Sequence, residues 1–523
     1  MILLPVLLPA AAAVIAFFIQ AHGVRRFLLA ATAAAHSLLV AWMWVDPARF
    51  AALGDWMAVD GLGRLFLGIT SALFLAVSLY AVGFLRRESG STAADPEEGF
   101  LFSNTPEALF TACLLGFLST MTLVTVSTHF GLMWVAIEAT TLVSAPLIHY
   151  HRHHRSLEAT WKYILLCSVG IAVALLGTYF IAAAVPRGSG GVSSLTFGRL
   201  VQRASELDAR WLKVGFLLLV VGYGTKMGLA PLHAWLPDAH SEAPSLVSAL
   251  LSGALLNCAF LAILRIVAVL GSAGLGEFSR QTLLVFGLAS MAVAAGLIIG
   301  QGDYKRMLAY SSVEHMGILA VGIGLGGTGD WGALFHAVNH SLTKAALFLL
   351  AGNLLAAYGT KKISDVGGAL RRVPVTGVLW IAGFFAILGA PPFGAFSSEL
   401  AILRAAVSSG SWVVVVLYSL FLAAVFAGMI GVLVRMAQGG RVPGSSSRGP
   451  AVHAVAGHAA GGAPGFGPAE SHGLAVAVLA PAREPVLGLI SPLVLLAGTL
   501  ALGLFVPGFL ASSLEQAIRL LGA

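Results

Sequence analysis

The segment 226–240 reads KMGLAPLHAWLPDAH and lies between two long apolar stretches of the chain. Its two prolines, Pro231 and Pro237, prevent a regular helix, because each removes a backbone hydrogen bond. An irregular backbone at membrane depth is stable only where it is buried in protein or lines a wet cavity. The segment therefore predicts a broken helix inside a membrane protein. Lys226 stands beside the break, where water and a mobile proton could reach it.

The composition of the whole chain supports a membrane protein. Of the 523 residues, 58% are hydrophobic and only 10% are charged, against about 25% in ordinary soluble domains. So few charges cannot cover the surface of a water-soluble protein of this size. The net charge of +7 comes from only 30 Lys and Arg. These lie in short clusters between apolar runs, a pattern that argues against nucleic-acid binding.

Uncharged windows of about 20 residues, enough for a helix to cross the hydrocarbon core, recur along the chain. We count about 14 spans, which predicts an all-α polytopic membrane protein with about 14 transmembrane helices. Residues 1–20 are apolar without a preceding basic residue, which favours a first span over a cleavable signal peptide. Loops after odd-numbered spans hold most of the Lys and Arg, so the positive-inside rule places them in the cytoplasm. Both termini would then face the non-cytoplasmic side of the plasma (inner) membrane of a prokaryote.

A second break, GAPPFG at 389–394, has the same form as the first. The pattern Gly-x-x-Pro-x-x-Ala starts at Gly228 and again at Gly389. In each half a lysine with a glycine eight residues later, Lys162 or Lys344, precedes the break. Paired broken helices in corresponding halves point to a transport path between them. We therefore expect two inverted five-helix repeats, spans 4–8 and spans 9–13, each with a broken helix.

These repeats divide the chain into five expected parts. The parts are the N-terminal spans 1–3 (1–106), the first repeat (107–270), the second repeat (281–437), a flexible loop rich in Gly, Ala and Pro (438–485) and a C-terminal span 14 (486–523).

Ionisable residues inside the expected spans are candidates for function, because each charge there costs roughly 2.5–3.5 kcal/mol on the insertion scale. The strongest are Glu138, Lys226, Lys344, Glu399 and the pair His336 and His340. For Glu138, a structural hydrogen bond to a neighbouring helix is the alternative. Lys162 and Arg265 lie nearer the ends of spans, where snorkelling to the interface and a functional role are both open.

The histidines have a helical spacing. His336, His340 and Lys344 are four residues apart and share one helix face, and His315 lies one span earlier. Histidine titrates near neutrality and can pass a proton. Metal binding and structural hydrogen bonding are the alternatives. The sequence shows no HExxH pattern or third ligand, so we expect no metal site.

The segment from His233 to Pro244 joins spans 7 and 8. Its acidic residues, Asp238 and Glu242, either cap helix ends or guard the access of protons. We favour the structural role for both.

Two motifs carry a resemblance to a known family. KMGLAPLHAWLPDAH (226–240) and KRMLAYSS (305–312) resemble the antiporter-like proton-translocating subunits of respiratory complex I, Mrp-type cation/proton antiporters and membrane-bound hydrogenases. The similarity covers roughly spans 3–13. Within this superfamily, SSVEHMG (311–317) and SGALLNC (252–258) look most like the F subunit of hydrogenase-4-type complexes.

The resemblance implies a proton relay and assigns its members. Glu138 and Lys226 would form an electrostatic switch, Lys344 would be a lysine of the central axis, and Glu399 would be the terminal acid or base. The intervening relay positions would be His315, His336 and His340. The chain departs from many complex I subunits at Asn257, where they carry Lys or His. Asparagine cannot titrate, so a relay through this point needs water or another group.

We therefore expect a proton-translocating subunit of a redox-driven complex, of the hydrogenase-4 or NADH:quinone oxidoreductase type. Its partners would be other membrane and peripheral redox subunits, the lipid bilayer and protons. The chain shows no nucleotide, flavin or iron–sulfur signature, so we expect no cofactor and no catalytic centre in it, and oxidoreductase activity would belong to the complex. The alternatives are an Mrp-type cation/proton antiporter module and a structural membrane anchor that conducts nothing.

Overall fold

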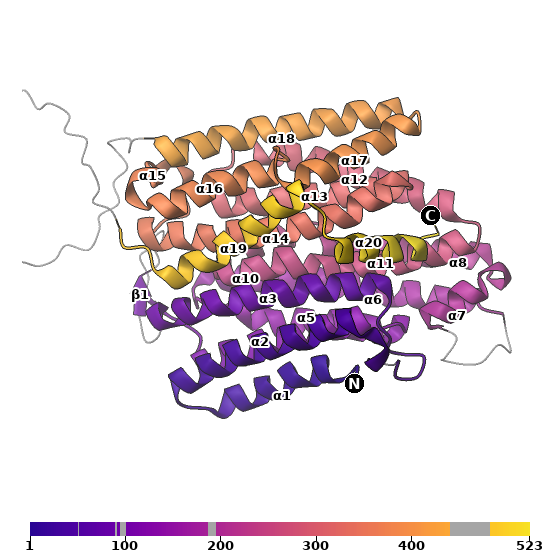
Figure 1. Ribbon diagram of the computed structural model, residues 1–523, viewed down its shortest axis with the longest axis horizontal. Helices are drawn as coiled ribbons and strands as arrows, with labels where there is room; N and C mark the ends of the chain where they lie inside the picture. The colour runs from indigo at the N-terminus through magenta and orange to yellow at the C-terminus, as the bar shows by residue number, and fades with distance from the viewer. Residues whose placement is uncertain (51, 89–91, 95–100, 187–194, 440–481, 523) are drawn as a thin grey trace, which may run out of the picture.

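The computed structural model describes all residues except 51, 89–91, 95–100, 187–194, 440–481 and 523. The chain forms a bundle of long, roughly parallel helices (Figure 1). The helices are α1 (Leu4–Phe18), α2 (His22–Val45), α3 (Gly61–Glu88), α4 (Glu107–Val126), α5 (Phe130–Ile148), α6 (His154–Ala184), α7 (Phe197–Gln202), α8 (Ala209–Met227), α9 (Trp235–Glu242), α10 (Ser245–Leu250), α11 (Leu256–Ser272), α12 (Gly276–Ile298), α13 (Tyr304–Leu325), α14 (Thr328–Tyr358), α15 (Ala369–Arg372), α16 (Pro374–Ile387), α17 (Gly394–Ser408), α18 (Trp412–Gln438), α19 (Val486–Leu504) and α20 (Gly508–Leu520). Two short antiparallel strands, β1 (Thr92–Ala94) and β2 (Leu101–Ser103), form a hairpin at one end of the bundle.

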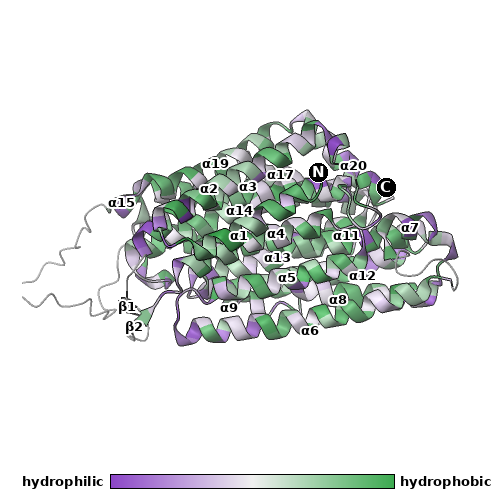
Figure 2. Ribbon diagram, turned by 90° about the horizontal axis from the view of Figure 1, so that it is seen from below, coloured by the Kyte–Doolittle hydropathy of each residue, from purple (hydrophilic) through white to green (hydrophobic). Residues whose placement is uncertain are grey.

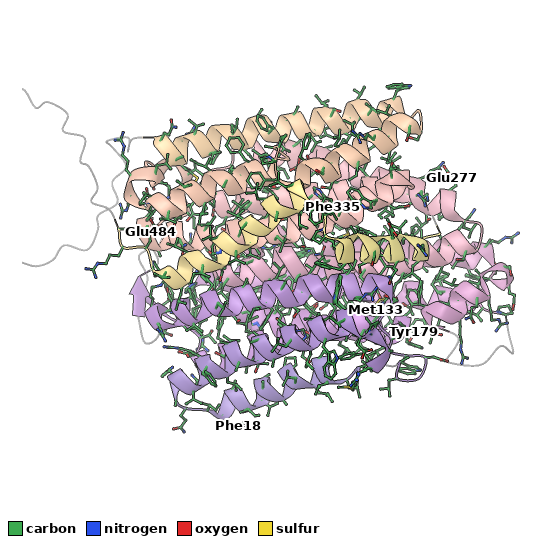
Figure 3. All side chains as sticks on the ribbon, viewed as in Figure 1. Phe18, Met133, Tyr179, Glu277, Phe335 and Glu484 are labelled. Carbon is green, nitrogen blue, oxygen red and sulfur yellow. The ribbon has the colours of Figure 1, made fainter. Side chains whose placement is uncertain are left out.

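The bundle has the build of a polytopic membrane protein. Among the described residues, eleven helical segments are long and apolar enough to cross a membrane, and α1 and α16 are shorter apolar helices. Apolar residues fill the middle of the bundle and polar residues gather at its two ends (Figure 2). Glu277 and Glu484 lie at these opposite ends (Figure 3). The predicted flexible loop, 438–485, falls almost entirely outside the described residues.

Both predicted breaks are present. Helix α8 ends at Met227, where Gly228 takes a left-handed conformation with φ of 84°, and α9 begins only at Trp235. Helix α16 ends at Ile387, Gly389 has φ of 63°, and α17 begins at Gly394. A residue with a Cβ rarely adopts this conformation, so glycine is required at both turns.

The segment from α10 to α11 contains a further irregularity. Residues Leu251–Leu255 form a π-helical turn between the two α-helices. Such single turns often mark functional positions, because they redirect the side chains that follow. Here the turn is followed at once by Leu256 and Asn257, a residue that cannot titrate.

Helices α6 and α8 pack closely through small residues, as is common between helices in membranes. A Cβ at Gly222 of α8 would lie 2.6 Å from the backbone nitrogen of Ala174 and from the carbonyl oxygen of Gly170 on α6. We expect Gly222→Ala to lower the free energy of unfolding by about 1–3 kcal/mol, because the backbones must separate. Thermal unfolding of the detergent-solubilised protein measures this loss.

The matched control for this prediction is Gly296→Ala on α12, where nothing lies within 4 Å of an added Cβ. Alanine has the higher helix propensity, so this variant should be at least as stable as the natural protein. Equal stability of the two variants would contradict the packing argument.

Candidate functional site

The first group of buried polar residues lies beside the break after α8. Lys226 is fully buried, and its Nζ donates hydrogen bonds to Thr141 Oγ1 and to the hydroxyl of Tyr163, both at 2.7 Å. Glu138 on α5 accepts a hydrogen bond from Ser168 Oγ at 2.7 Å and a longer one from Thr141 Oγ1 at 3.5 Å. Within the described residues no ion pair joins Glu138 to Lys226 directly. Thr141 instead bridges the two charges.

The centre of the bundle links the two halves through neutral groups. Asn257 on α11 is buried, and its Nδ2 donates to Ser341 Oγ of α14 at 2.7 Å and to the carbonyl of Gly253 at 2.9 Å. The hydroxyl of Ser341 donates in turn to the carbonyl of Ala337 at 2.6 Å. The contact therefore holds α11 against α14 with no titratable group of its own.

The second group surrounds α14 and includes three of the predicted histidines. His315 Nδ1 lies 2.9 Å from His336 Nε2, and His336 Nδ1 lies 2.8 Å from Ser398 Oγ. The ring centroids of His315 and His340 are 5.2 Å apart. Lys344 is fully buried and donates to the carbonyl of a residue on α13, Leu308, at 2.8 Å. The structure thus brings the predicted relay residues of the second half together.

Glu399 lies at the second break. It is only partly buried, and its carboxylate rests against Gly389, where a Cβ would overlap Oε2. The left-handed glycine therefore makes room for the acid. His315, His336 and Glu399 each offer one ligand atom within 4.8 Å of the others, a grouping that could hold a metal ion. The sequence showed no third ligand, because these three residues come from three different helices.

Two of the accessory residues, Lys162 and Asp238, belong to ion pairs near one end of the bundle. Lys162 pairs with Asp238 at 2.9 Å and with Glu158 at 2.7 Å, and Asp238 also pairs with Arg306 at 2.6 Å. Asp238 thus ties α9 to α6 and α13. His233, between α8 and α9, is half-buried, with its ring centroid 6.3 Å from that of Tyr310.

Arg265 is fully buried on α11, so it does not snorkel. Its Nη2 pairs with Asp60 Oδ2 at 3.1 Å and donates to the carbonyl of Thr125 at 3.2 Å. The guanidinium therefore joins α11 to the start of α3 and the end of α4.

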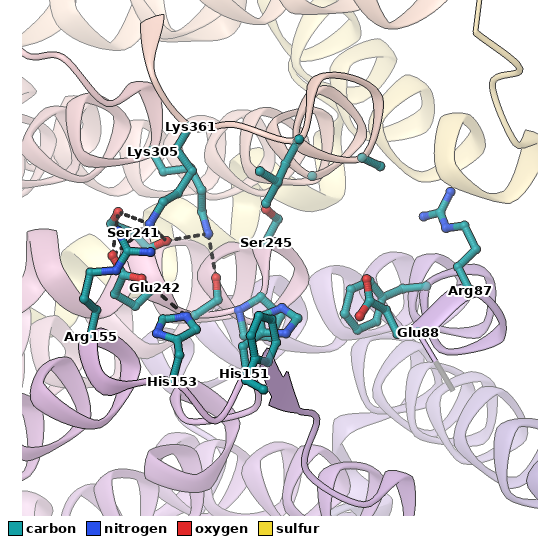
Figure 4. A pocket seen from close by; sticks show the side chains of 18 of the residues that line it. Arg87, Glu88, His151, His153, Arg155, Ser241, Glu242, Ser245, Lys305 and Lys361 are labelled. Carbon is teal, nitrogen blue, oxygen red and sulfur yellow. Dashed lines mark hydrogen bonds and ion pairs between the residues drawn. The ribbon is translucent and has the colours of Figure 1, made fainter. Parts of the chain in front are cut away.

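A cavity of about 430 Å³ opens at the end of the bundle that carries β1 and β2 (Figure 4). Lys361 pairs with Glu242 at 2.8 Å on its wall, and the buried Lys305 donates to the carbonyl of Ser241 at 3.0 Å. His151 and His153 lie opposite these lysines (Figure 4). The cavity is thus lined by charged and titratable groups.

Sequence reasoning passed over several buried polar residues near these groups. His240 on α9 is fully buried, stacks on Phe348 with ring centroids 5.1 Å apart, and has no hydrogen-bond partner for either ring nitrogen within the described residues. Tyr163 carries no charge to draw attention to it, yet it binds Lys226. His240 ends the motif HAWLPDAH. Its place shortly after the break was the signal in the sequence that could have marked it as a functional residue.

His151 supplies a prediction about pH. Burial, followed by the charges of Lys305, His153 and Lys361, lowers the pKa of His151 from 6.5 to about 3. Below about pH 6.5 His151 binds a proton in the unfolded chain but stays neutral in the folded chain. The free energy of unfolding therefore falls as the pH falls from 6.5 toward 3. Between pH 7 and pH 5 we expect this residue to cost about 1–2 kcal/mol of stability.

The measurement compares thermal unfolding of the natural protein and His151→Gln at both pH values, with the exposed His154→Gln as control. The stability of His151→Gln should depend less on pH, whereas that of His154→Gln should follow the natural protein. The same acid-induced loss in all three proteins would contradict the assignment.

Comparison with known proteins gives a consistent set of relatives. Residues 127–426 match the family described as NADH:quinone oxidoreductase/Mrp antiporter, TM. A hydrogenase-4 component F homolog from Methylacidiphilum infernorum (isolate V4) is 38% identical over 355 residues, which cover 68% of this chain and 73% of the relative.

Two solved structures have a similar fold. One is a chain of the membrane-bound sulfane sulfur reductase (MBS), an archaeal respiratory membrane complex. It matches with a TM-score of 0.81 at 20% sequence identity, and the match covers 99% of this chain and 97% of that chain. The other is a chain of the Mrp complex from Dietzia sp. DQ12-45-1b. It matches with a TM-score of 0.73 at 22% sequence identity, and the match covers 99% of this chain and 93% of that chain.

Proposed function

Since this chain belongs to the NADH:quinone oxidoreductase/Mrp antiporter transmembrane family, we propose that it translocates protons as an integral subunit of a redox-driven membrane complex. One observation carries the proposal: each of two groups of buried and partly buried titratable side chains lies beside a broken helix. Buried charges at membrane depth are costly and mark ion or proton pathways. Broken helices place irregular backbone and water at the same depth.

The proposed membrane arrangement has 14 spans. The eleven long apolar segments are joined by α1, α8 and the broken pair α16 and α17. The left-handed glycines at the two breaks, Gly228 and Gly389, support two inverted repeats over 107–270 and 281–437. The two marked termini lie toward the same end of the bundle, opposite β1 and α15 (Figure 1). Most loop Lys and Arg lie at the β1 end, so we place that end in the cytoplasm.

We propose that protons enter the second half through the cytoplasmic cavity. His240 is the connecting group, because it interacts electrostatically with Lys305 at the cavity and with Lys344 beyond it. From Lys344 the histidines lead toward Glu399 on α17. A second cavity of about 390 Å³ lies beside this helix and is lined by Arg404 among others. It would release the proton on the opposite side of the membrane.

The first half would act as the switch. Lys226 holds its proton while Thr141 and Glu138 stay close, since a nearby carboxylate favours the charged ammonium. Electron transfer in partner subunits would shift Glu138, and Lys226 would then release its proton. Asn257 cannot titrate, so it interrupts the series of titratable groups between the two halves. We propose that the change in charge at Lys226 acts electrostatically on the titratable groups of the second half.

The partners of this chain would be redox subunits. The 38% identity to a hydrogenase-4 component F homolog supports a hydrogenase- or quinone-reductase-type complex. The proton relay lies in this chain, whereas the electron carriers would lie in those partners.

The test uses closed inside-out vesicles that contain the assembled complex. The electron donor of the co-purified partners is added, and acidification of the lumen is followed with a pH-sensitive dye. We expect acidification that stops when electron transfer is inhibited. Pumping without sodium dependence supports the redox pump. A pH gradient that sodium dissipates would favour the Mrp-type antiporter instead, and no acidification with normal electron transfer would favour a structural anchor.

A further inference from the structure

Glu314 is a buried acid that the predicted relay does not include. It lies on α13 immediately before His315, and only 3% of its surface is exposed. Within the described residues it makes no hydrogen bond and no ion pair. A carboxyl group in the membrane interior without such a partner is costly, so its presence calls for a role.

Packing shows which way Glu314 faces. Residues four apart share a helix face, so Glu314 points the same way as Ile318. Ile318 packs in one apolar cluster with Ile402 of α17 and Tyr418 of α18. Ile402 lies one helical turn beyond Glu399. Both acids therefore line the space between α13, α17 and α18.

The charges around Glu314 come from each helix packed against it. Helix α14 presents Lys344, which interacts electrostatically with Glu314. Helix α17 presents Glu399, whose charge also acts on Glu314. Helix α18 presents Tyr418, whose hydroxyl is buried and has no hydrogen-bond partner within the described residues. The next residue, His315, lies about 100° further round α13, and its ring faces those of His336 and His340. Glu314 thus stands between a proton donor, Lys344, and a proton acceptor, Glu399.

The repeat assignment gives Glu314 a counterpart. Counting α1 as the first span, α5 is the fifth and α13 is the tenth, so the two helices occupy equivalent places in the proposed repeats. Glu138 lies near the middle of α5, and Glu314 lies near the middle of α13. Each repeat then contains one glutamate facing its own broken helix.

We propose that Glu314 is a proton-carrying residue of the second repeat, placed between Lys344 and Glu399. In the first step the N–H bond of the Lys344 ammonium breaks, and the proton bonds to the Glu314 carboxylate. This leaves a neutral amine and a neutral acid. In the second step the proton moves from Glu314 to the Glu399 carboxylate, and Glu314 is again an anion. The inference rests on the proposed proton translocation.

The test is Glu314→Gln in the intact complex in closed vesicles. We expect proton translocation per electron transferred to fall by about tenfold or more, because the amide cannot accept the proton. Electron transfer and the amount of assembled complex should stay normal. Glu314→Asp keeps the carboxyl group and should restore most of the translocation with a shifted pH dependence. Glu277→Gln, an exposed acid on α12, is the matched control.

The outcomes separate this inference from the function. If Glu314→Gln pumps normally while Lys226→Ala does not, Glu314 carries no proton but the chain still translocates protons. If both variants pump normally, the proposed function itself is wrong. If the complex with Glu314→Gln does not assemble, the pH dependence of pumping by Glu314→Asp is the deciding measurement. If the pH profile of pumping by Glu314→Asp is identical to that of the natural protein, Glu314 has only a structural role.

Discussion

Lys226→Ala is expected to lower redox-coupled proton translocation by about two orders of magnitude, the usual contribution of a group that gives and takes a proton. Alanine cannot bind the proton that Lys226 carries while Glu138 and Thr141 lie close to it. The loss should be specific, because the hydrogen bonds of Lys226 within the described residues go to two side-chain hydroxyls, those of Thr141 and Tyr163. The fold does not depend on an ion pair at this point, so the complex should still assemble.

The measurement is lumen acidification per electron transferred in closed vesicles. Lys226→Arg keeps a charge but holds its proton permanently, so it should be nearly as inactive as alanine. Lys362→Ala removes an exposed lysine and should pump normally. Unchanged pumping by Lys226→Ala would refute the proposed switch.

Glu399→Gln has the second largest expected effect. The acid lies on α17, where its carboxylate contacts Gly389 of the break. Its neighbours Ser397 and Leu400 line the cavity proposed for release, so without Glu399 the proton has no final acceptor. We expect translocation to fall by about 10²-fold, with electron transfer either normal or slowed by tight coupling. Glutamine has nearly the same size as glutamate, so the contact with Gly389 is preserved and packing should not change.

The control for this variant is Glu515→Gln on the exposed face of α20, which should pump normally. A fully active Glu399→Gln, together with failure of the complex to assemble when the chain is deleted, would support the structural anchor. A complex that assembles with Glu399→Gln but pumps no protons excludes that reading.

Sequence reasoning selected the charged residues of the candidate site and missed the uncharged residues that contact them. Lys226, Lys344 and Glu399 stood out because a charge among apolar residues is visible in the sequence itself. Tyr163 and Thr141 are ordinary residues of apolar helices, and only the packing of α5, α6 and α8 places them on Lys226. Glu314 is part of the SSVEHMG motif, but the sequence alone does not show which neighbouring helices its carboxyl group faces.

Arg265 illustrates the same limit. From the sequence it could equally have reached the membrane surface or served the relay. In the fold it pairs with Asp60, two hundred residues earlier along the chain, and it holds helix ends together. The partner could not have been chosen from spacing, because many acids lie near the ends of spans.

The class of the protein, its apolar helices, the two breaks and the charges within apolar segments all follow from the sequence alone. These are local properties: hydropathy, proline and glycine act within a window of about one helix. Helix packing, in contrast, sets which charged residues come into contact, which of them are bridged by hydroxyl groups and which helix each acid faces. Proton transfer depends on such contacts, because donor and acceptor must lie within hydrogen-bond reach, directly or through water, and here they come from helices far apart in the chain.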